Sequence, residues 1–395
     1  MAKVAYQKLE NHGSTLWVLL GLHLAVILVG LGAAFYMEHH GHVVTGMTNQ
    51  VVWGTPHVFA VFLIVAASGA LNVASFSSVF GRADYKPYAR LSGILAIALL
   101  SGGLAVLVLD LGRPDRLIVA MTTYNFKSIF AWNIYLYTGF MGVVAAYLFV
   151  MMDRRVSRIH WPTKAVGSFA FVWRLALTTG TGSIFGFLIA REAYSAAIMA
   201  PLFIAASFLY GLAFMVLVLM TTGAETKKDM LGADMTKKFG GLLILFSLAT
   251  LYFTAVHHLT KIYAAEYRDV EAFFLLGGGI YTLTFWLGQV VIGHLVPLAI
   301  LVFAGRGRGA VAVASALFLV GGVAHMYVTI IGAQAYPLNL FPGMEVTSSF
   351  GDGSVAAYWP SLPEVLLGVS GISIAMLLTA VALKLLPFLP RPASA

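Results

Sequence analysis

The chain has 395 residues, of which 60% are hydrophobic and only 10% are charged, whereas charged residues make up roughly a quarter of an average soluble domain. Its net charge of +8 does not indicate nucleic-acid binding, because the basic residues stand in short clusters between apolar runs and form no stripe along an amphipathic face. The sequence contains no cysteine, which excludes disulfides, thiolate metal sites and iron-sulfur ligation within this chain.

Apolar runs long enough to cross a membrane recur along the chain. About 20 helical residues cross a hydrocarbon core of about 30 Å. The sequence therefore predicts an all-α integral membrane protein, a single polytopic domain over residues 1–395, with about ten transmembrane helices. We expect them near residues 14–37, 56–79, 90–110, 128–152, 165–190, 197–222, 239–263, 274–303, 309–332 and 363–387. The polar start of the chain predicts that the first helix is retained and is not a cleaved signal peptide.

The Lys and Arg residues alternate between the two sides of this ten-helix scheme. Of the 24, six fall on one side: Arg113, Arg116, Lys127, Arg191, Lys261 and Arg268. Another, Arg174, lies inside the fifth predicted helix, and the other 17 fall on the side of the termini. Because cytoplasmic loops carry an excess of Lys and Arg, we expect both termini to be cytoplasmic.

A short internal repeat relates the second and sixth helices. Both open from the outer side, with the sequences Thr55-Pro56-His57-Val58-Phe59-Ala60 and Ala200-Pro201-Leu202-Phe203-Ile204-Ala205. Their even separation favours a parallel repeat, with two four-helix bundles, helices 2–5 (residues 56–190) and helices 6–9 (residues 197–332), flanked by helices 1 and 10. Residues 333–362 contain no Lys or Arg but several Pro, Gly and aromatic residues, which predicts an outer cap loop or partner surface; a plain linker is the alternative.

Arg174 is the sharpest polar exception within the predicted spans. It lies about ten residues, or about 15 Å, into the fifth helix, near mid-membrane. An ionisable side chain in hydrocarbon costs several kcal/mol unless it is paired or hydrated. We therefore interpret Arg174 as an element of a proton path or the partner of a buried acid. A side chain that snorkels or ties carbonyl groups between helices is the alternative.

Candidate site residues stand at the outer ends of the second and third helices. His57 follows Trp53 and Thr55 at the start of the second helix, and an imidazole there could hydrogen-bond a quinone carbonyl and carry its proton. A histidine beside an aromatic belt is the alternative. Asp110 ends the third helix close to Arg113, so the two residues form either a structural ion pair or a proton acceptor that Arg113 orients.

Other polar residues within or beside the spans are more often packing residues than functional ones: His257, His258, Gln289, His294, His325 and Glu364. Haem would need axial histidines at matched depths on facing helices, and only His57 or His257 with His325 are conceivable pairs. We expect no haem. The sequence has no phosphate-binding loop, nucleophile elbow or HExxH motif, so we expect no metal site, no catalytic residue and no independent catalysis.

Short motifs in a fixed order resemble the NrfD-type membrane subunits of polysulfide reductases, hydrogenases and related complexes. The likeness covers residues from about 50 to 390, and its motifs are Trp53-Gly54, Asp110-Leu111-Gly112-Arg113-Pro114, Asn125, Ser128, Trp132, Thr181-Gly182-Ser183, Pro201-Leu202-Phe203, Phe285-Trp286, Pro297 and Tyr358-Trp359-Pro360-Ser361-Leu362-Pro363-Glu364. Within that family, the ten-span layout and length are most similar to the P subunits of the Dsr complexes of sulfur-metabolising prokaryotes.

The resemblance implies a subunit of the prokaryotic cytoplasmic membrane with a non-covalent menaquinone or ubiquinone site near the outer face. It implies no haem or iron-sulfur cluster in this chain. The implied partners are a periplasmic ferredoxin-like subunit with [4Fe-4S] clusters and other membrane and cytochrome subunits of a sulfur-metabolism oxidoreductase complex, with coupled proton transfer.

Carried over by position, the quinone-site likeness rests on His57 with Trp53 and Thr55, and the outer acid is Asp110, beside Arg113. Arg174, Asp110 and Thr179 form the expected proton path. Some family members have a histidine where this chain has Thr178-Thr179, which puts a quinone contact from that helix in doubt.

Two other functions remain open. A secondary transporter would need a midplane site on broken helices, for which Gly180–Gly186 and Gly277–Gly279 are candidates, although transporters of this kind favour inverted repeats. The other is a passive anchor for a redox partner, without quinone chemistry of its own.

Overall fold

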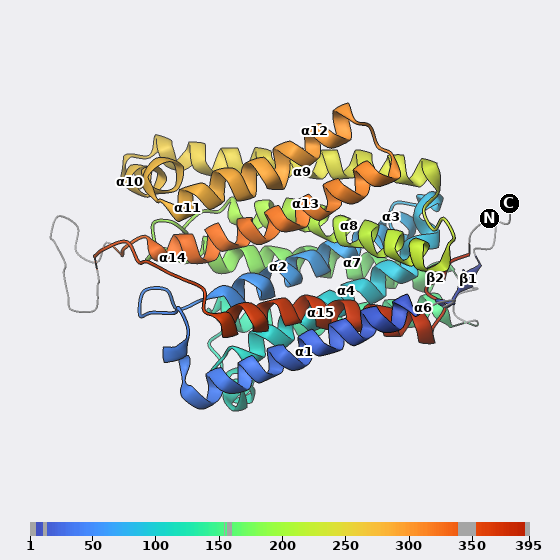
Figure 1. The fold of residues 1–395 in the computed structure, drawn as a ribbon, viewed down its shortest axis with the longest axis horizontal. Coiled ribbons are helices and arrows are strands. Elements are labelled where there is room, and N and C mark those ends of the chain that lie inside the picture. Colours follow the sequence, from blue (N-terminus) through green and yellow to red (C-terminus); the bar gives the residue numbers. More distant parts are fainter. Residues whose placement is uncertain (1–4, 11–13, 154, 156–159, 339–352, 392–395) are drawn as a thin grey trace.

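The computed structural model describes residues 5–10, 14–153, 155, 160–338 and 353–391, and nearly all of its regular structure is helical (Figure 1). Long helices run along the long axis of the molecule: α1 (Thr15–His40), α2 (Thr55–Ala70) with α3 (Asn72–Ser78), α4 (Ala89–Leu109), α6 (Ile129–Met152), α7 (His160–Gly186), α8 (Met199–Thr226), α9 (Gly232–Tyr263), α13 (Arg308–Tyr327) and α15 (Leu362–Leu385). One further span is built from α11 (Ile280–Leu283), the π-helix η7 (Thr284–Leu295) and α12 (Val296–Phe303).

Short elements connect these spans: η1 (His42–Val44), η2 (Ala83–Tyr88), η3 (Pro114–Arg116), α5 (Leu117–Thr122), η5 (Ala265–Tyr267), α10 (Arg268–Ala272), the π-helix η6 (Phe273–Gly277), the π-helix η8 (Val328–Gly332) and α14 (Ala333–Ala335). The described residues include one antiparallel strand pair, β1 (Tyr6–Gln7) with β2 (Leu389–Pro390), in which Tyr6 lies opposite Pro390.

Nine of the spans, counted within the described ranges, are long and apolar enough to cross a membrane. The helix α7, which is the fifth predicted span, is not among these nine. It has 27 residues, about 40 Å at 1.5 Å per residue, but Arg174 and several threonines make it less apolar. The predicted all-α integral membrane fold is therefore confirmed. The fifth helix ends at Gly186 and not near 190, because residues 187–198 fold into turns.

The core lies where α2 crosses α8. In the most apolar stretch of the span formed by α2 and α3, 94% of the residues are buried inside the protein, against 83% for α8 and 17% for α1, so α2 and α8 are central and α1 is peripheral. The crossing is close because it places glycines at the contact. A Cβ atom at Gly211 would collide with the backbone of Gly69 and Ala70.

The remaining helices form two groups around this centre. The helices α2, α4, α6 and α7 contact one another in a ring, and α8, α9, α13 and the η7 span form a second ring. Outside them, α1 packs along α15, which packs on α4 and α2. These contacts are compatible with two four-helix bundles and two flanking helices. The assignment of residues 56–190 and 197–332 as separate units stays a prediction.

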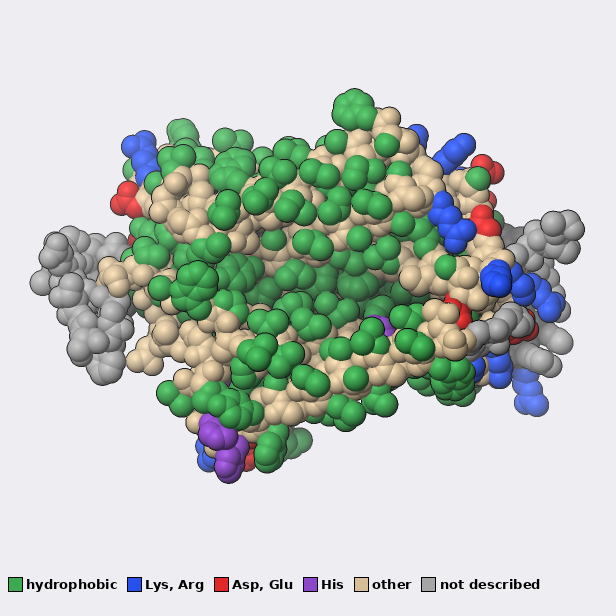
Figure 2. Space-filling model, viewed as in Figure 1, with side chains coloured by type: hydrophobic (Ala, Val, Ile, Leu, Met, Phe, Trp, Pro, Cys, Tyr) green, Lys and Arg blue, Asp and Glu red, His purple; other side chains and the backbone are tan. Residues whose placement is uncertain are grey.

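The two ends of the molecule differ in charge. Both strands, near the two termini, lie at one end (Figure 1), which we call the termini end. Lys and Arg side chains gather there, while hydrophobic side chains cover the middle of the visible face (Figure 2). The opposite end, which we call the far end, holds the first residues of α2 and the last residues of α4 and α9.

The loop before α15 contributes to the far end. Of the predicted cap at residues 333–362, residues 339–352 lie outside the described part. The remainder folds against the start of α2: Gln334 Oε1 accepts hydrogen bonds from the backbone N–H groups of Val52, at 2.9 Å, and Trp53, at 3.0 Å. The described segments of the cap are therefore attached to the segment that leads to His57.

Candidate functional site

The first candidate site lies at the far end, where α2 begins and α4 ends. Pro56 occupies the first turn of α2, a position that suits proline because its missing N–H has no helical partner there. His57 follows it, within the first turn of the helix. Asp110 is the C-cap residue of α4, and its backbone N–H donates to Val106 O at 3.1 Å.

His57 and Asp110 form a close acid-imidazole pair. Asp110 Oδ2 lies 2.7 Å from His57 Nδ1, and Asp110 Oδ1 lies 3.8 Å from Nε2 of His42, in η1. The Asp110 side chain is 1% exposed, the His57 side chain 17% and the His42 side chain 35%. The buried carboxylate thus lies between two histidines that are both partly exposed. Since Nδ1 of His57 faces the acid, Nε2 is the nitrogen left for a ligand.

Arg113 does not pair with Asp110. Its guanidinium makes two hydrogen bonds of 3.0 Å to the carboxylate of Asp115, and both side chains are more than half exposed. These bonds lower the pKa of the Asp115 carboxyl. The expected ion pair of Asp110 with Arg113, or its orientation by Arg113, is therefore wrong. The chain turns at Gly112, with φ of +68°, so Arg113 leaves the helix direction and reaches water, while histidines face Asp110.

Aromatic rings surround the exposed face of His57. The Trp53 ring stacks on it at 6.2 Å between centroids and 24° between planes. Trp53 also contacts Phe130 at 5.8 Å and Phe185 at 6.1 Å. Phe130 is 43% exposed, so this wall reaches the surface of the helix group. Flat rings beside a hydrogen-bonding imidazole suit a flat, ring-shaped ligand with polar substituents.

The hydroxyl group of Thr55 is not available to a ligand at this aromatic wall, because it contacts Tyr358. Its Oγ1 lies 2.9 Å from the hydroxyl oxygen of Tyr358, which also accepts the Thr55 backbone N–H at 2.8 Å and donates to Glu364 Oε1 at 2.5 Å. Glu364 Oε2 accepts N–H groups of Gly46 and Ser361. Thr55 thus fixes the start of α2. Sequence reasoning singled out Glu364 and missed Tyr358, although Tyr358 belongs to the motif quoted for the family resemblance.

Arg174 is fully buried, at 0% exposure, and its guanidinium lies 4.9 Å from the Phe171 ring centre and 4.5 Å from that of Phe208. Among the described residues, none of its three side-chain nitrogens has a hydrogen-bond partner. Thr179, in contrast, is exposed. Five residues turn a helix by about 500°, so the two side chains leave α7 on different faces. The expected path through Thr179 is therefore wrong, and buried Thr178 lies next to Arg174 instead, donating to Arg174 O at 3.0 Å.

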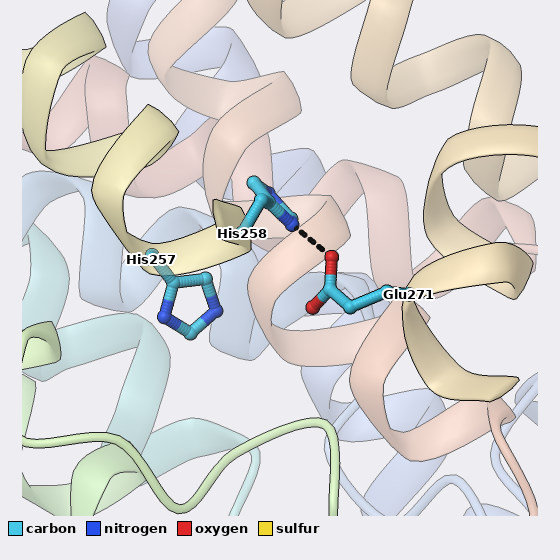
Figure 3. Close-up of side chains that lie close together, drawn as sticks. All are labelled: His257, His258 and Glu271. Carbon is cyan, nitrogen blue, oxygen red and sulfur yellow. Dashed lines mark hydrogen bonds and ion pairs between the residues drawn. The ribbon is translucent and has the colours of Figure 1, made fainter. Parts of the chain in front are cut away.

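A second polar cluster lies within the other helix group, also toward the far end (Figure 3). His257 and His258 come from α9 and Glu271 from α10, and each offers a donor or acceptor atom within 4.8 Å of the others. A cavity of about 40 Å³ adjoins the cluster and is lined by both histidines, Gln289 and His325 among others. Glu271 was missed from the sequence because it lies in a short element that reads as a loop.

The remaining predicted polar residues have partners within the second group. His325 Nδ1 lies 2.8 Å from the Tyr210 hydroxyl, and His294 Nδ1 lies 2.8 Å from Ser247 Oγ. His57, with which His325 was a conceivable haem pair, faces Asp110 instead.

The sequence matches known proteins over nearly its whole length. The family described as "Polysulphide reductase, NrfD" matches residues 43–337. The "Hdr-like menaquinol oxidoreductase integral membrane subunit" of Archaeoglobus fulgidus is 27% identical over 99% of this chain and 98% of the relative. A putative dimethyl sulfoxide reductase membrane subunit of Halobacterium salinarum is 26% identical over 93% and 90%, and a polysulfide reductase chain of Wolinella succinogenes is 23% identical over 73% and 96%.

Proposed function

Because the chain belongs to the polysulphide reductase NrfD family, we propose that it is the quinone-reactive membrane subunit of a multi-subunit iron-sulfur oxidoreductase complex. The Archaeoglobus relative is named as a menaquinol oxidoreductase subunit, which supports a menaquinone or ubiquinone as the ligand. The name of the Wolinella relative supports a role in sulfur metabolism, as in the Dsr-type complexes that the sequence resembles.

The observation that carries the proposal is the contact of 2.7 Å between His57 and buried Asp110, beside the Trp53 ring. The residues fit a quinone: an imidazole nitrogen is free to hydrogen-bond a ring carbonyl, an aromatic wall matches the ring, and an acid stands behind the imidazole. A bound quinone supplies two-electron, two-proton redox chemistry. Electrons pass to [4Fe-4S] clusters of a docked ferredoxin-like subunit.

In this proposal, the protons are carried by the chain's own residues. His57 hydrogen-bonds the ligand through Nε2 and exchanges a proton with it, because an imidazole can both donate and accept near neutral pH. Asp110 holds Nδ1 and balances the charge of the imidazolium. His42, 3.8 Å from the other carboxylate oxygen and one-third exposed, connects the acid to the far-end surface. Arg174, with Thr178, supplies the buried polar groups for a second, inward path.

We propose that the far end faces the periplasm and the termini end the cytoplasm. The support is the excess of Lys and Arg at the termini end, seen in the sequence and in Figure 2. The ferredoxin-like partner then docks at the far end, close to the His57 wall, together with the other membrane and cytochrome subunits.

Two observations favour this function over secondary transport. The segment Gly180–Gly186 does not interrupt α7, and the break at Gly277–Gly279 lies at the far end of its span, before α11. Transport sites on broken helices lie near the midplane. In addition, α2 and α8 both begin at the far end, which supports a parallel relation of the two groups over an inverted one.

The substitution His57→Ala tests the proposal. In the assembled complex, it is expected to lower quinol-linked electron transfer by about 100-fold or more, the usual contribution of a positioned acid-base group, with insertion and subunit assembly unchanged. Asp110→Asn is expected to cause a smaller loss. His40→Ala, an exposed histidine of α1 at the same end, is the matched control. Unchanged turnover in His57→Ala, together with no binding of quinone analogues, would leave a passive anchor.

A further inference from the structure

The second helix group contains a protonatable site of its own. We propose that Glu271, His258 and His257 form a hydrated proton-transfer site that serves the second group separately from the His57–Asp110 pair. This inference rests on the proposed function, because quinol oxidation is the reaction that would drive it. It adds a route between the middle of the membrane and the far side, besides the His57–Asp110 pair and the inward path of Arg174.

In the cluster, an acid contacts one imidazole and a second imidazole lies nearby (Figure 3). His258 Nδ1 lies 2.6 Å from Glu271 Oε2, and the rings of His257 and His258 are 5.1 Å apart. Glu271 is 2% exposed and His257 8%. A buried carboxylate bonded to one imidazole and within reach of another can accept a proton from one side and pass it to the other.

Two buried polar atoms beside the cluster point to a bound occupant. Nδ1 of His257 and Oε1 of Gln289 have no hydrogen-bond partner among the described residues, although both side chains are more than nine-tenths buried and both line the cavity. Buried polar atoms are nearly always hydrogen-bonded in native proteins, to protein or to water. Water in the cavity would give both atoms a hydrogen-bond partner.

The size of the cavity decides which molecule it holds. At about 40 Å³ it has room for a few water molecules, since one water needs roughly 10–15 Å³ on this measure. It is far smaller than a ligand pocket of roughly 300 Å³ or more, so a quinone ring does not fit. The occupant is therefore water, which carries protons along hydrogen bonds.

The backbone around the cavity is unusual. The three π-helical segments among the described residues, η6, η7 and η8, each contribute lining residues: Phe274, Gln289, and Val328 with Thr329. Such segments are rare and occur frequently at functional sites. Their convergence on one cavity is independent of the side-chain chemistry and supports a functional interior.

A polar face on α9 continues the cavity toward mid-membrane. Its buried residues include Lys261, His257, Thr254, Thr250 and Ser247. From His257 to Ser247 is ten residues, or about 15 Å, and there Ser247 contacts His294 at 2.8 Å.

For the next two turns toward the termini end, the buried face of α9 is apolar. Leu243 and Phe239 of α9 are both 0% exposed, and Phe318 of α13 packs on the His294 ring. The polar route of α9 therefore connects the far end with the middle of the membrane.

The protons that enter it there come from the inward path proposed for Arg174, whose guanidinium lies 4.5 Å from the Phe208 ring; that ring is 4.9 Å from the ring of Phe246, the neighbour of Ser247. They are taken up from the termini side and add to the protons that quinol itself releases.

The neighbouring charges favour a proton over a metal ion. Lys261 lies one turn from His257 and donates to the carbonyl oxygens of Glu192, at 2.5 Å, Ala193, at 2.9 Å, and Tyr194, at 2.7 Å. Its charge opposes a dication. Adjacent helical residues also point about 100° apart, so His257 and His258 are poorly placed to chelate one ion. Besides Glu271 and Lys261, the titratable groups facing the cluster are Glu192, Tyr194 and His325.

The test uses the complete complex in sealed vesicles, with electron transfer from quinol and proton release measured in the same sample. Glu271→Gln keeps the side-chain shape and removes the acid. We expect electron transfer to stay within about two-fold of the parent. The number of protons released per electron is expected to fall by about half, because quinol still releases its own protons through the His57–Asp110 pair. Exposed Glu266→Gln, on the same connecting segment, is expected to leave both unchanged.

A second variant covers the case in which Glu271→Gln does not assemble. His257→Gln leaves the bond between His258 and Glu271 in place and is expected to give the same loss of proton release. Unchanged proton release in an assembled variant would overturn the proposal, and so would one equivalent of zinc in the parent that is lost in Glu271→Gln. Failure of the quinone assignment would give a different result, because His57→Ala would then leave the rate of electron transfer unchanged.

Discussion

At the scale of single residues, the hydroxyl of Tyr358 connects three segments at the far end. It accepts the backbone N–H of Thr55 and donates to Glu364, which in turn accepts the N–H of Gly46. Burial and the Glu364 carboxylate raise the pKa of the Tyr358 phenol, so it remains a hydrogen donor at physiological pH. One buried oxygen thus fixes the start of the helix that carries His57.

The substitution Tyr358→Phe is expected to lower stability. It leaves the Thr55 N–H and one Glu364 oxygen without their partner, and a buried polar group left unpaired costs about 1–3 kcal/mol. We expect the unfolding midpoint of the purified protein, measured by fluorescence on heating, to fall by several degrees. Tyr263→Phe is the control, because Tyr263 is 91% exposed. An unchanged midpoint for Tyr358→Phe would contradict the role given to this hydroxyl group.

The residue scale also separates what could be predicted for the site from what could not. His57 and Asp110 could be proposed from the sequence because the membrane makes polar residues at helix ends conspicuous, and the structure brings them together beside Trp53. Their role in binding a quinone stays a prediction. The partner of Asp110 was misjudged, because Arg113 is near it in sequence but Gly112 turns the chain away, whereas His42 is remote in sequence and near in space. Thr179 was assigned without regard to which face of α7 it occupies.

At the scale of elements, helix existence and order were predictable because long apolar runs between charged loops leave few alternatives in lipid. The π-helical segments were not, since η7 has an apolar sequence like that of an ordinary span. Contacts between helices were also inaccessible, except where small residues hint at them. The crossing of α2 and α8 at Gly69 and Gly211 is such a case.

The substitution Gly211→Ala is expected to disrupt this crossing. Its Cβ would overlap the backbone of Gly69 and Ala70, and backbone, unlike the end of a flexible side chain, cannot move aside, so we expect a cost of about 1–3 kcal/mol or more. The measurement is the yield and unfolding midpoint of monodisperse protein. Gly142→Ala in α6, where nothing lies within 4 Å of the new atom, should be neutral or slightly stabilising. Equal yields and unfolding midpoints of the two variants would show that α2 and α8 can move apart at Gly211 without cost.

At the scale of the whole molecule, the first and last described segments pair as β1 and β2, and basic side chains gather at that end (Figures 1 and 2). This asymmetry followed from sequence, because counting Lys and Arg needs only the order of spans and loops. The distribution of burial did not: α2 is enclosed and α1 is not, although both are strongly apolar. An apolar helix can face either lipid or other helices, so its composition does not predict how much of it is buried. Only the packing in the folded protein shows this.

The absence of cysteine makes the orientation directly testable. Lys237 and Glu266 are exposed positions at the two ends of the α9 region. In cells with a permeable outer envelope, a membrane-impermeant maleimide is expected to label Glu266→Cys and to leave Lys237→Cys unlabelled until the membrane is opened. The unsubstituted protein has no thiol to react. The opposite labelling pattern would place the termini end outside and would reverse the proposed direction of proton release.

The pairing of the first and last spans has a consequence for biosynthesis. Helix α1 packs along α15, with Leu9 N donating to Leu383 O at 2.8 Å and Gly30 set against Ser370. A ribosome delivers α1 to the bilayer first, yet its main neighbour emerges last. After insertion, α1 therefore stays in the lipid without its main packing partner until translation is nearly complete. A transcript truncated before α15 would yield a protein whose first span has no such partner and is exposed to quality-control proteases.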